Sequence, residues 1–164
     1  MKKLLLLLGL LFVCLTSCQK KDNSIEKIHK RIQNYDFNEF KNCHIFNRKG
    51  TFYIKQNNRE FKVTKSIFSN RIKTISEIGS NEPGLIINDT TKMSFEKLIV
   101  SFNKLGALSV EVDSTNNVYL SFPLEDRCTY YFLKLSDKNS LLDLKKGFYK
   151  NYSGDWYLDK ECSN

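Results

Sequence analysis

Apolar and polar residues recur at two different spacings along this chain, and the spacings predict two kinds of element. Apolar residues three or four positions apart predict one helix that starts near Ser24 and one over residues 93–105 that ends at Gly106. Alternating apolar and polar residues predict strands. The predicted strands cover residues 43–47, 51–56, 60–64, 108–112, 118–122 and 127–135, and a final hairpin covers residues 148–158 around Ser153-Gly154.

Three further segments have weaker patterns. Ile72, Ile75 and Ile78 are three residues apart and predict a short helix. Residues 85–87 follow a Pro-Gly turn and fit a short strand. Residues 139–147 fit a short helix that Asn139 caps and Gly147 ends.

These elements predict a single domain over residues 25–164. The chain contains no repeat and no long linker that would divide it. Strands joined by short turns favour antiparallel pairing. We therefore expect an α+β fold, an antiparallel β-sheet with two or three helices packed on one face.

The first residues predict export rather than a membrane span. Lys2 and Lys3 precede an apolar run from Leu4 to Leu15 that only Gly9 interrupts. A membrane-spanning helix needs about 20 apolar residues, and this run is shorter. A basic start followed by a short apolar run is typical of a cleaved export signal.

The next residues, Leu15-Thr16-Ser17-Cys18, resemble the lipobox of bacterial lipoproteins, which reads leucine, two small residues and cysteine. The resemblance implies that residues 1–17 are removed, that Cys18 is lipidated, and that residues 18–24 form a tether. Cys14 would leave with the leader, so it cannot act as a metal or redox partner of Cys18. A plain secretory signal is the alternative.

Lipidation would anchor the protein to a membrane, because two or more acyl chains hold a protein there stably. In lipoproteins of bacteria with two membranes, an Asp after the lipidated cysteine often marks retention in the inner membrane. Gln19 occupies that position. The resemblance therefore implies an outer-membrane location in a bacterial cell envelope.

The charge of the chain gives a weaker indication of partners. Without Lys2 and Lys3, 24 basic residues stand against 18 acidic ones, a net charge of +6. The lysines are scattered and no nucleic-acid-binding motif is present, so we expect no nucleic acid partner. A positive charge favours an acidic protein partner, since like potentials repel at encounter.

Three cysteines stay with the mature chain: Cys43, Cys128 and Cys162. An oxidising envelope allows one disulfide among them, and three pairings are possible. We favour Cys128 with Cys162, because this bond joins the last strand to the long strand over residues 127–135. Cys43 is then expected to be a small buried residue.

Few residues suit catalysis or metal binding. His29 and His44 are the only histidines. Cys43 and His44 have the chemistry of a nucleophile and a base, but neighbouring strand residues point to opposite faces. The sequence has no close-spaced zinc ligands and no glycine-rich phosphate loop, GxSxG or HExxH motif. We therefore expect no catalytic residue, metal or cofactor, with an envelope hydrolase as the alternative.

Aromatic residues gather in the last third of the chain. The candidate ligand-binding residues are Tyr131, Tyr149, Trp156 and Tyr157, because such side chains combine a large apolar surface with a polar group. Core packing is the alternative. Strand alternation places Trp156 and Tyr157 on opposite faces of a sheet. The ending, a Tyr-rich strand, Gly and Trp-Tyr-Leu, is similar to the closing hairpin of NTF2-like domains.

These features predict a lipid-anchored envelope protein that binds a protein or a glycan and catalyses no reaction. An immunity protein or an inhibitor is one specific form of this function. A purely structural surface lipoprotein is a further alternative.

Overall fold

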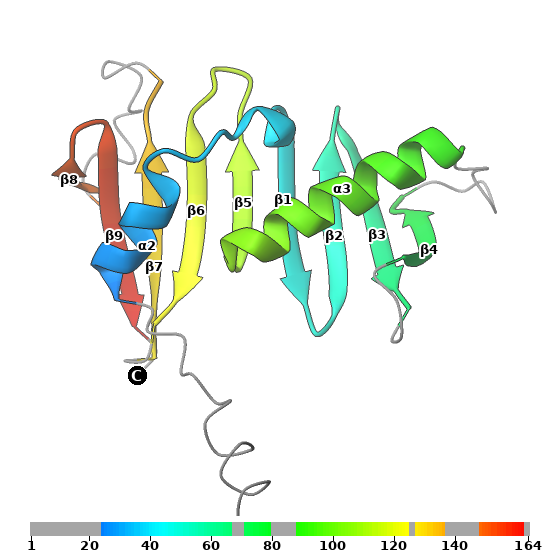
Figure 1. Ribbon diagram of the computed structural model, residues 1–164, viewed down its shortest axis with the longest axis horizontal. Helices are drawn as coiled ribbons and strands as arrows, with labels where there is room; N and C mark the ends of the chain where they lie inside the picture. The colour runs from blue at the N-terminus through cyan, green and yellow to red at the C-terminus, as the bar shows by residue number, and fades with distance from the viewer. Residues whose placement is uncertain (1–23, 67–70, 80–87, 125–126, 137–147, 163–164) are drawn as a thin grey trace, which may run out of the picture.

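The computed structural model describes residues 24–66, 71–79, 88–124, 127–136 and 148–162. In this part of the chain nine antiparallel strands form one sheet, in the order β4-β3-β2-β1-β5-β6-β7-β9-β8 (Figure 1). The strands are β1 (Cys43–Arg48), β2 (Thr51–Gln56), β3 (Arg59–Lys65), β4 (Ile72–Glu77), β5 (Ser109–Val112), β6 (Val118–Pro123), β7 (Cys128–Lys134), β8 (Lys150–Ser153) and β9 (Trp156–Cys162).

Two α-helices and one 3₁₀ turn complete the described elements: α2 (Ile25–Ile32), η1 (Asn38–Phe40) and α3 (Asp89–Leu105). Each α-helix begins at a polar cap. The Ser24 hydroxyl accepts the N–H of Lys27 at 3.4 Å, and the Asn88 side chain accepts the N–H of Thr91 at 2.8 Å. The second helix ends at Gly106, whose φ of 66° is the left-handed conformation that glycine adopts at little cost.

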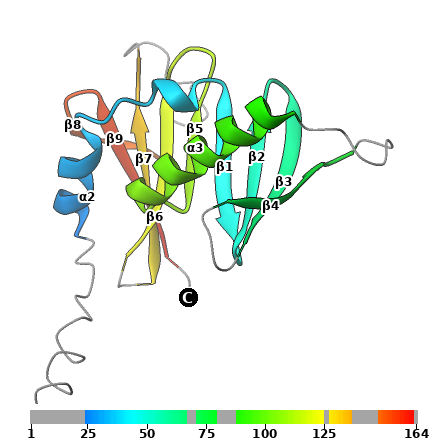
Figure 2. The ribbon, with the colours of Figure 1, turned by 45° about the vertical axis from the view of Figure 1, so that its right-hand side comes forward.

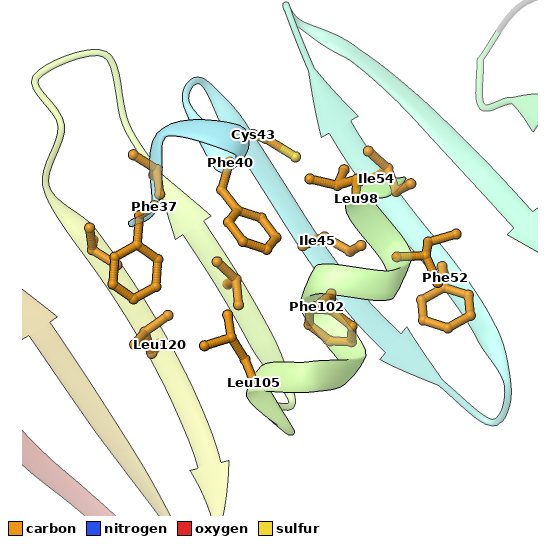
Figure 3. Close-up of a cluster of buried hydrophobic side chains, with 14 of the residues drawn as sticks. Phe37, Phe40, Cys43, Ile45, Phe52, Ile54, Leu98, Phe102, Leu105 and Leu120 are labelled. Atoms are coloured by element: carbon orange, nitrogen blue, oxygen red, sulfur yellow. The ribbon is translucent and has the colours of Figure 1, made fainter. Parts of the chain in front are cut away.

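Both helices lie on the same side of the sheet, which we call the first face (Figures 1 and 2). α3 buries one stripe of residues against β1, β2 and β5, as Figure 3 shows. Phe102 contacts Phe52 with ring centroids 6.0 Å apart, and Phe95 contacts Phe61 at 5.1 Å. The first face therefore carries the core, and the opposite side is the second face.

Along the strand direction the sheet has two ends, and the course of α2 distinguishes them. One end is marked by a row of paired residues on six neighbouring strands: Trp156, Lys134, Val118, Val112, Cys43 and Gln56. We call this the distal end. α2 runs toward it, because Ile25 lies near Lys160 while His29 contacts Trp156 with ring centroids 6.1 Å apart. The described chain therefore begins at the end opposite the distal end (Figure 1).

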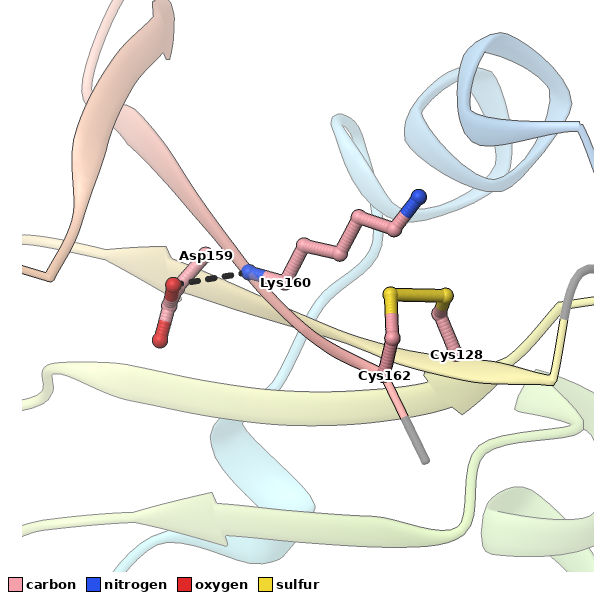
Figure 4. The surroundings of a disulfide bond; sticks show 4 residues. All are labelled: Cys128, Asp159, Lys160 and Cys162. Atoms are coloured by element: carbon pink, nitrogen blue, oxygen red, sulfur yellow. Dashed lines mark hydrogen bonds between the residues drawn. A yellow bond between two sulfur atoms is a disulfide. The ribbon is translucent and has the colours of Figure 1, made fainter. Parts of the chain in front are cut away.

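The predicted cysteine pairing is confirmed. Cys128 and Cys162 face each other on β7 and β9, with Cα atoms 4.0 Å apart, and a disulfide joins them (Figure 4). Cys43 is a free thiol and is buried on the first face. The bond ties the last strand to β7, which lies inside the sheet between β6 and β9.

The expected α+β class is wrong. Strands make up 47% of the described residues and helices 25%, so the fold is mostly β. The difference arises because the chain after the first meander returns to extend the same sheet. β1 pairs with β5, more than 60 residues further along, and four more strands follow β5 in the sheet.

The predicted helix at Ile72, Ile75 and Ile78 is also wrong, because residues 72–77 form strand β4. A bulge explains the misleading spacing. Thr64 pairs with Thr74 and Lys65 with Ile72, so Lys73 is an extra residue in β4. This extra residue turns Ile72 and Ile75 to the same face although they are three positions apart.

Other predicted elements agree with the structure or lie outside it. The helix at Ser24, the helix ending at Gly106 and the strands on either side of them are confirmed. The leader, Cys18, the strand at 85–87 and the helix at 139–147 lie outside the described residues. None of the helices within the described ranges is long and apolar enough to cross a membrane.

Candidate functional site

The second face of the sheet is the candidate site, since both described helices pack on the first face. Its residues follow from the strand registers. One row across five neighbouring strands is Phe46, Ser109, Ser121, Tyr131 and Asp159, and the adjacent row is His44, Glu111, Tyr119, Leu133 and Tyr157. Most of these side chains are half-buried, Ser121 and Leu133 are buried, and Glu111 is exposed.

Tyrosines cluster in the half of this face formed by β5 to β9. Tyr119 and Tyr157 lie opposite Leu133 on its two neighbouring strands, and Tyr131 lies opposite Asp159. The Tyr131 hydroxyl donates a 2.8 Å hydrogen bond to Oε2 of Glu161. This hydrogen bond raises the pKa of Tyr131, because it stabilises the neutral phenol.

Tyr149, which precedes β8, belongs to the same cluster. Burial raises its pKa to about 12, and the negative charge of Asp159 and the nearby Tyr119, Tyr131 and Glu111 act in the same direction. An electrostatic effect on the pKa of Tyr149 requires that these groups lie close to it. Three of the four predicted ligand-binding residues, Tyr131, Tyr149 and Tyr157, are therefore together on the second face. We call them, with Tyr119, the tyrosine cluster.

Carboxylates surround the tyrosine cluster. Glu111, Asp159 and Glu161 all lie on the second face of β5 and β9. Within the described strands β5 to β9, the lysines lie at first-face positions. Lys134 pairs with Trp156, Lys150 with Leu158 and Lys160 with Tyr130, which are all first-face residues. The local charge is thus negative, although the whole sequence has a net charge of +8.

The other half of the second face, formed by β1 to β3, carries stacked aromatic rings. Phe46 and Tyr53 stack with ring centroids 4.9 Å apart and nearly parallel planes, and His44 lies 5.4 Å from Phe46. Lys55 and Lys62 lie beyond these rings on β2 and β3, and Lys55 lies 3.8 Å from Glu60. The second face therefore carries charges of both signs near β3 and is acidic near β9.

Trp156, the fourth predicted ligand-binding residue, lies in the core. It is 2% exposed on the first face, where its ring contacts His29, Phe37 and Phe132 at centroid distances of 6.1, 6.3 and 6.4 Å. The alternation of β9 places Trp156 and Tyr157 on opposite faces, as the sequence predicts.

Cys43 and His44 do not form a catalytic pair with each other. Cys43 is buried on the first face, and burial raises the pKa of its thiol to about 12, so almost no thiolate forms at neutral pH. His44 lies on the second face. Across the described ranges, no group of three His, Cys, Asp or Glu side chains is placed to hold a metal ion.

Sequence reasoning did not single out Glu111, Tyr119, Phe46 or Tyr53. The available signal was their position between the apolar residues of alternating strands, which places them away from the core. Their gathering depends on the pairing of β1 with β5, which local patterns do not reveal.

The chain was compared with models of protein families, with curated proteins and with solved structures, and none of them matches it.

Proposed function

We propose that this chain is a lipid-anchored protein of a bacterial cell envelope that binds a protein partner through the tyrosine cluster and the carboxylates around it. The observation that carries the proposal is the pairing of a helix-covered first face with a half-exposed second face rich in tyrosine. Tyrosine contributes strongly to protein interfaces, because it buries a large area and keeps a hydrogen-bonding group.

The size of the second face suits a protein rather than a small molecule. Nine strands about 4.8 Å apart, each roughly 15–20 Å long, give the whole second face about 600–800 Å², and the five strands of the tyrosine cluster supply about half of it. One partner of a standard protein–protein interface buries about 800 Å². No deep cleft is needed for such a flat contact.

The local charge, rather than the net charge, defines the partner. Glu111, Asp159 and Glu161 favour a partner that presents lysine or arginine, and the tyrosine rings add cation–π attraction. This revises the expectation of an acidic partner, which rested on the charge of the whole chain. A cationic toxin or hydrolase of the envelope has the required chemistry.

The anchor supports this arrangement. The lipobox ends at Cys18, and the described chain begins at Ser24, six residues later. Six extended residues span at most roughly 20 Å, which keeps the domain close to the membrane surface. Gln19 in place of Asp favours the outer membrane among bacteria with two membranes.

Affinity purification from detergent-solubilised envelopes tests the binding. The full chain should retain a partner, the variant Tyr131→Ala/Tyr157→Ala should lose it, and retention should fall as salt rises, because the contact is partly electrostatic. Lys104→Ala on the exposed side of α3 is the matched control and should retain the partner. Equal retention by the tyrosine variant would refute the proposal.

Mass spectrometry of the mature N-terminus tests the anchor. The expected product starts at Cys18 and carries the mass of a diacylglycerol. An unmodified Cys18, or cleavage at another position, would contradict lipidation.

A further inference from the structure

A polar hollow of about 400 Å³ lies at the distal end of the sheet, where β2, β1 and β5 meet. It is separate from the tyrosine cluster, although Glu111 borders both. Its polar lining comes from three segments of the chain: Asn42 and His44, Lys55 with Asn57 and Asn58, and Glu111 with Asp113 and Ser114.

Three asparagines form the rim of the hollow. Asn42, Asn57 and Asn58 have φ angles of 54°, 52° and 62°, in the left-handed region that asparagine tolerates better than most residues. Asn57 and Asn58 are the two central residues of the tight turn that joins β2 and β3. The turn geometry therefore explains why asparagine occurs there, but not why three amides border one hollow.

The side chains around the hollow have unused hydrogen-bonding capacity. In the part of the chain that the structure describes, the side chains of Asn42, Asn57, Asn58, His44 and Glu111 make no hydrogen bond. Asp113 at the same hollow differs, since its Oδ1 accepts the N–H groups of Thr115 and Asn117 at 2.9 Å and so holds its own loop. Each free amide offers two donors and one acceptor.

The carboxylates of Glu111 and Asp113 and the ammonium group of Lys55 line the hollow, and Lys55 also lies 3.8 Å from Glu60. The lining therefore carries an excess of negative charge, which disfavours an anionic ligand. Among the residues that the structure describes, no group of three His, Cys, Asp or Glu side chains is placed to hold a metal ion. Amide and carboxylate groups together match the vicinal hydroxyl groups of a sugar, each of which both donates and accepts.

Cys43, Val112 and the ring of His44 give the hollow an apolar side. Ligand sites commonly combine such an apolar wall with a few convergent polar groups in volumes of about 300–1,000 Å³. One or two sugar rings fit a volume of this size.

We propose that the hollow formed by Asn42, His44, Asn57, Asn58 and Glu111 binds a neutral saccharide of one or two rings. The site is at the distal end, whereas the described chain begins near Lys160, which is four residues, or roughly 13 Å, along β9 from the distal Trp156. It faces away from the anchored end, where a glycan of the envelope can reach it. This site does not depend on the partner proposed for the tyrosine cluster.

Saturation-transfer NMR with the full chain in detergent tests the site. The probes are glucose, galactose, mannose, N-acetylglucosamine and their disaccharides, with glucuronic acid as a charged member and calcium chloride as a separate arm. At least one neutral probe should receive saturation, and it should outcompete glucuronic acid.

Paired variants locate the binding. Asn57→Asp keeps the turn, because aspartate also tolerates the left-handed region, but it replaces two donors by a charge and should weaken binding about tenfold. Glu111→Gln should weaken it in the same direction. Asn103→Asp, the same substitution at an exposed position of α3, should leave binding unchanged, and so should Tyr131→Ala.

The proposal fails if no neutral saccharide binds, or if Asn57→Asp and Asn103→Asp bind equally well. It also fails if calcium alone occupies the hollow or if only the anionic probe binds. Loss of the protein partner in Tyr131→Ala with intact sugar binding would separate this site from the proposed function.

Discussion

The hydroxyl of Tyr131 on β7 donates a 2.8 Å hydrogen bond to the carboxylate of Glu161 on β9, on the side of the sheet that the described helices leave uncovered. The two residues are diagonal neighbours, since Tyr131 pairs directly with Asp159. The ring is therefore held beside two carboxylates and remains half-exposed. A preorganised tyrosine loses little conformational freedom when a partner covers it.

Tyr131 and Trp156 should respond very differently to truncation, although both were candidates for ligand binding. Trp156→Ala removes a ring that is 2% exposed and should lower the free energy of unfolding by about 3–5 kcal/mol. Tyr131→Ala removes a half-exposed ring and should cost less than about 1.5 kcal/mol. Urea denaturation of the two variants measures the difference.

A small loss in Trp156→Ala would mean that this ring is not part of the core. A loss in Tyr131→Ala as large as in Trp156→Ala would mean that the second face is not available to a partner.

Reduction of the disulfide should destabilise the protein substantially. Cys128 and Cys162 are 34 residues apart, and closing a ring of this size is worth roughly 3–4 kcal/mol in the loop-entropy model. Cys128→Ala/Cys162→Ala should therefore melt at a lower temperature than the oxidised protein and should no longer respond to a reductant.

Cys43→Ala is the control, because Cys43 makes no disulfide and the variant should still respond to reductant. A reductant without effect on the melting temperature of the unmodified protein would contradict the pairing.

Stability should fall at alkaline pH because of Tyr149. Its pKa is about 12 in the folded protein, whereas an unfolded tyrosine ionises near 10. Below about pH 10 both states keep the proton, so this tyrosine causes no change in stability. Between about pH 10 and 12 only the unfolded state loses the proton, so the free energy of unfolding decreases as the pH rises.

Tyr149→Phe has no such proton and should show a shallower decrease over the same range. Tyr35, whose pKa burial also raises to about 12, adds a further decrease in both proteins. The measurement is the urea midpoint at several pH values from 8 to 11, with the phenolate absorbance as an independent titration. Identical pH profiles for the two proteins would contradict the burial of Tyr149.

Helix α3 shows what local patterns can predict. Its stripe of Phe95, Leu98, Ile99, Phe102 and Leu105 is buried, and the helix ends at Gly106 as its sequence predicts. Such features depend on residues within one or two helical turns. The disulfide was predictable for another reason, since only three cysteines follow the predicted leader.

Strand β4 and the second face show what local patterns miss. The spacing of Ile72 and Ile75 comes from a bulge opposite Thr64 and Lys65, which only the pairing partner defines. The second face depends on the pairing of β1 with β5 across more than 60 residues. Alternation tells which residues share a face within one strand, but the neighbours of Tyr131 on other strands follow only from the register.

Site-specific photo-crosslinking in living cells tests the central claim most directly. A photoreactive amino acid replaces Tyr131 on the second face in one strain and Asn103 on the exposed side of α3 in another. Partner binding through the tyrosine cluster predicts a discrete crosslinked protein from position 131, absent from position 103 and diminished by Asp159→Asn. The same product from both positions, or none from position 131, would contradict it.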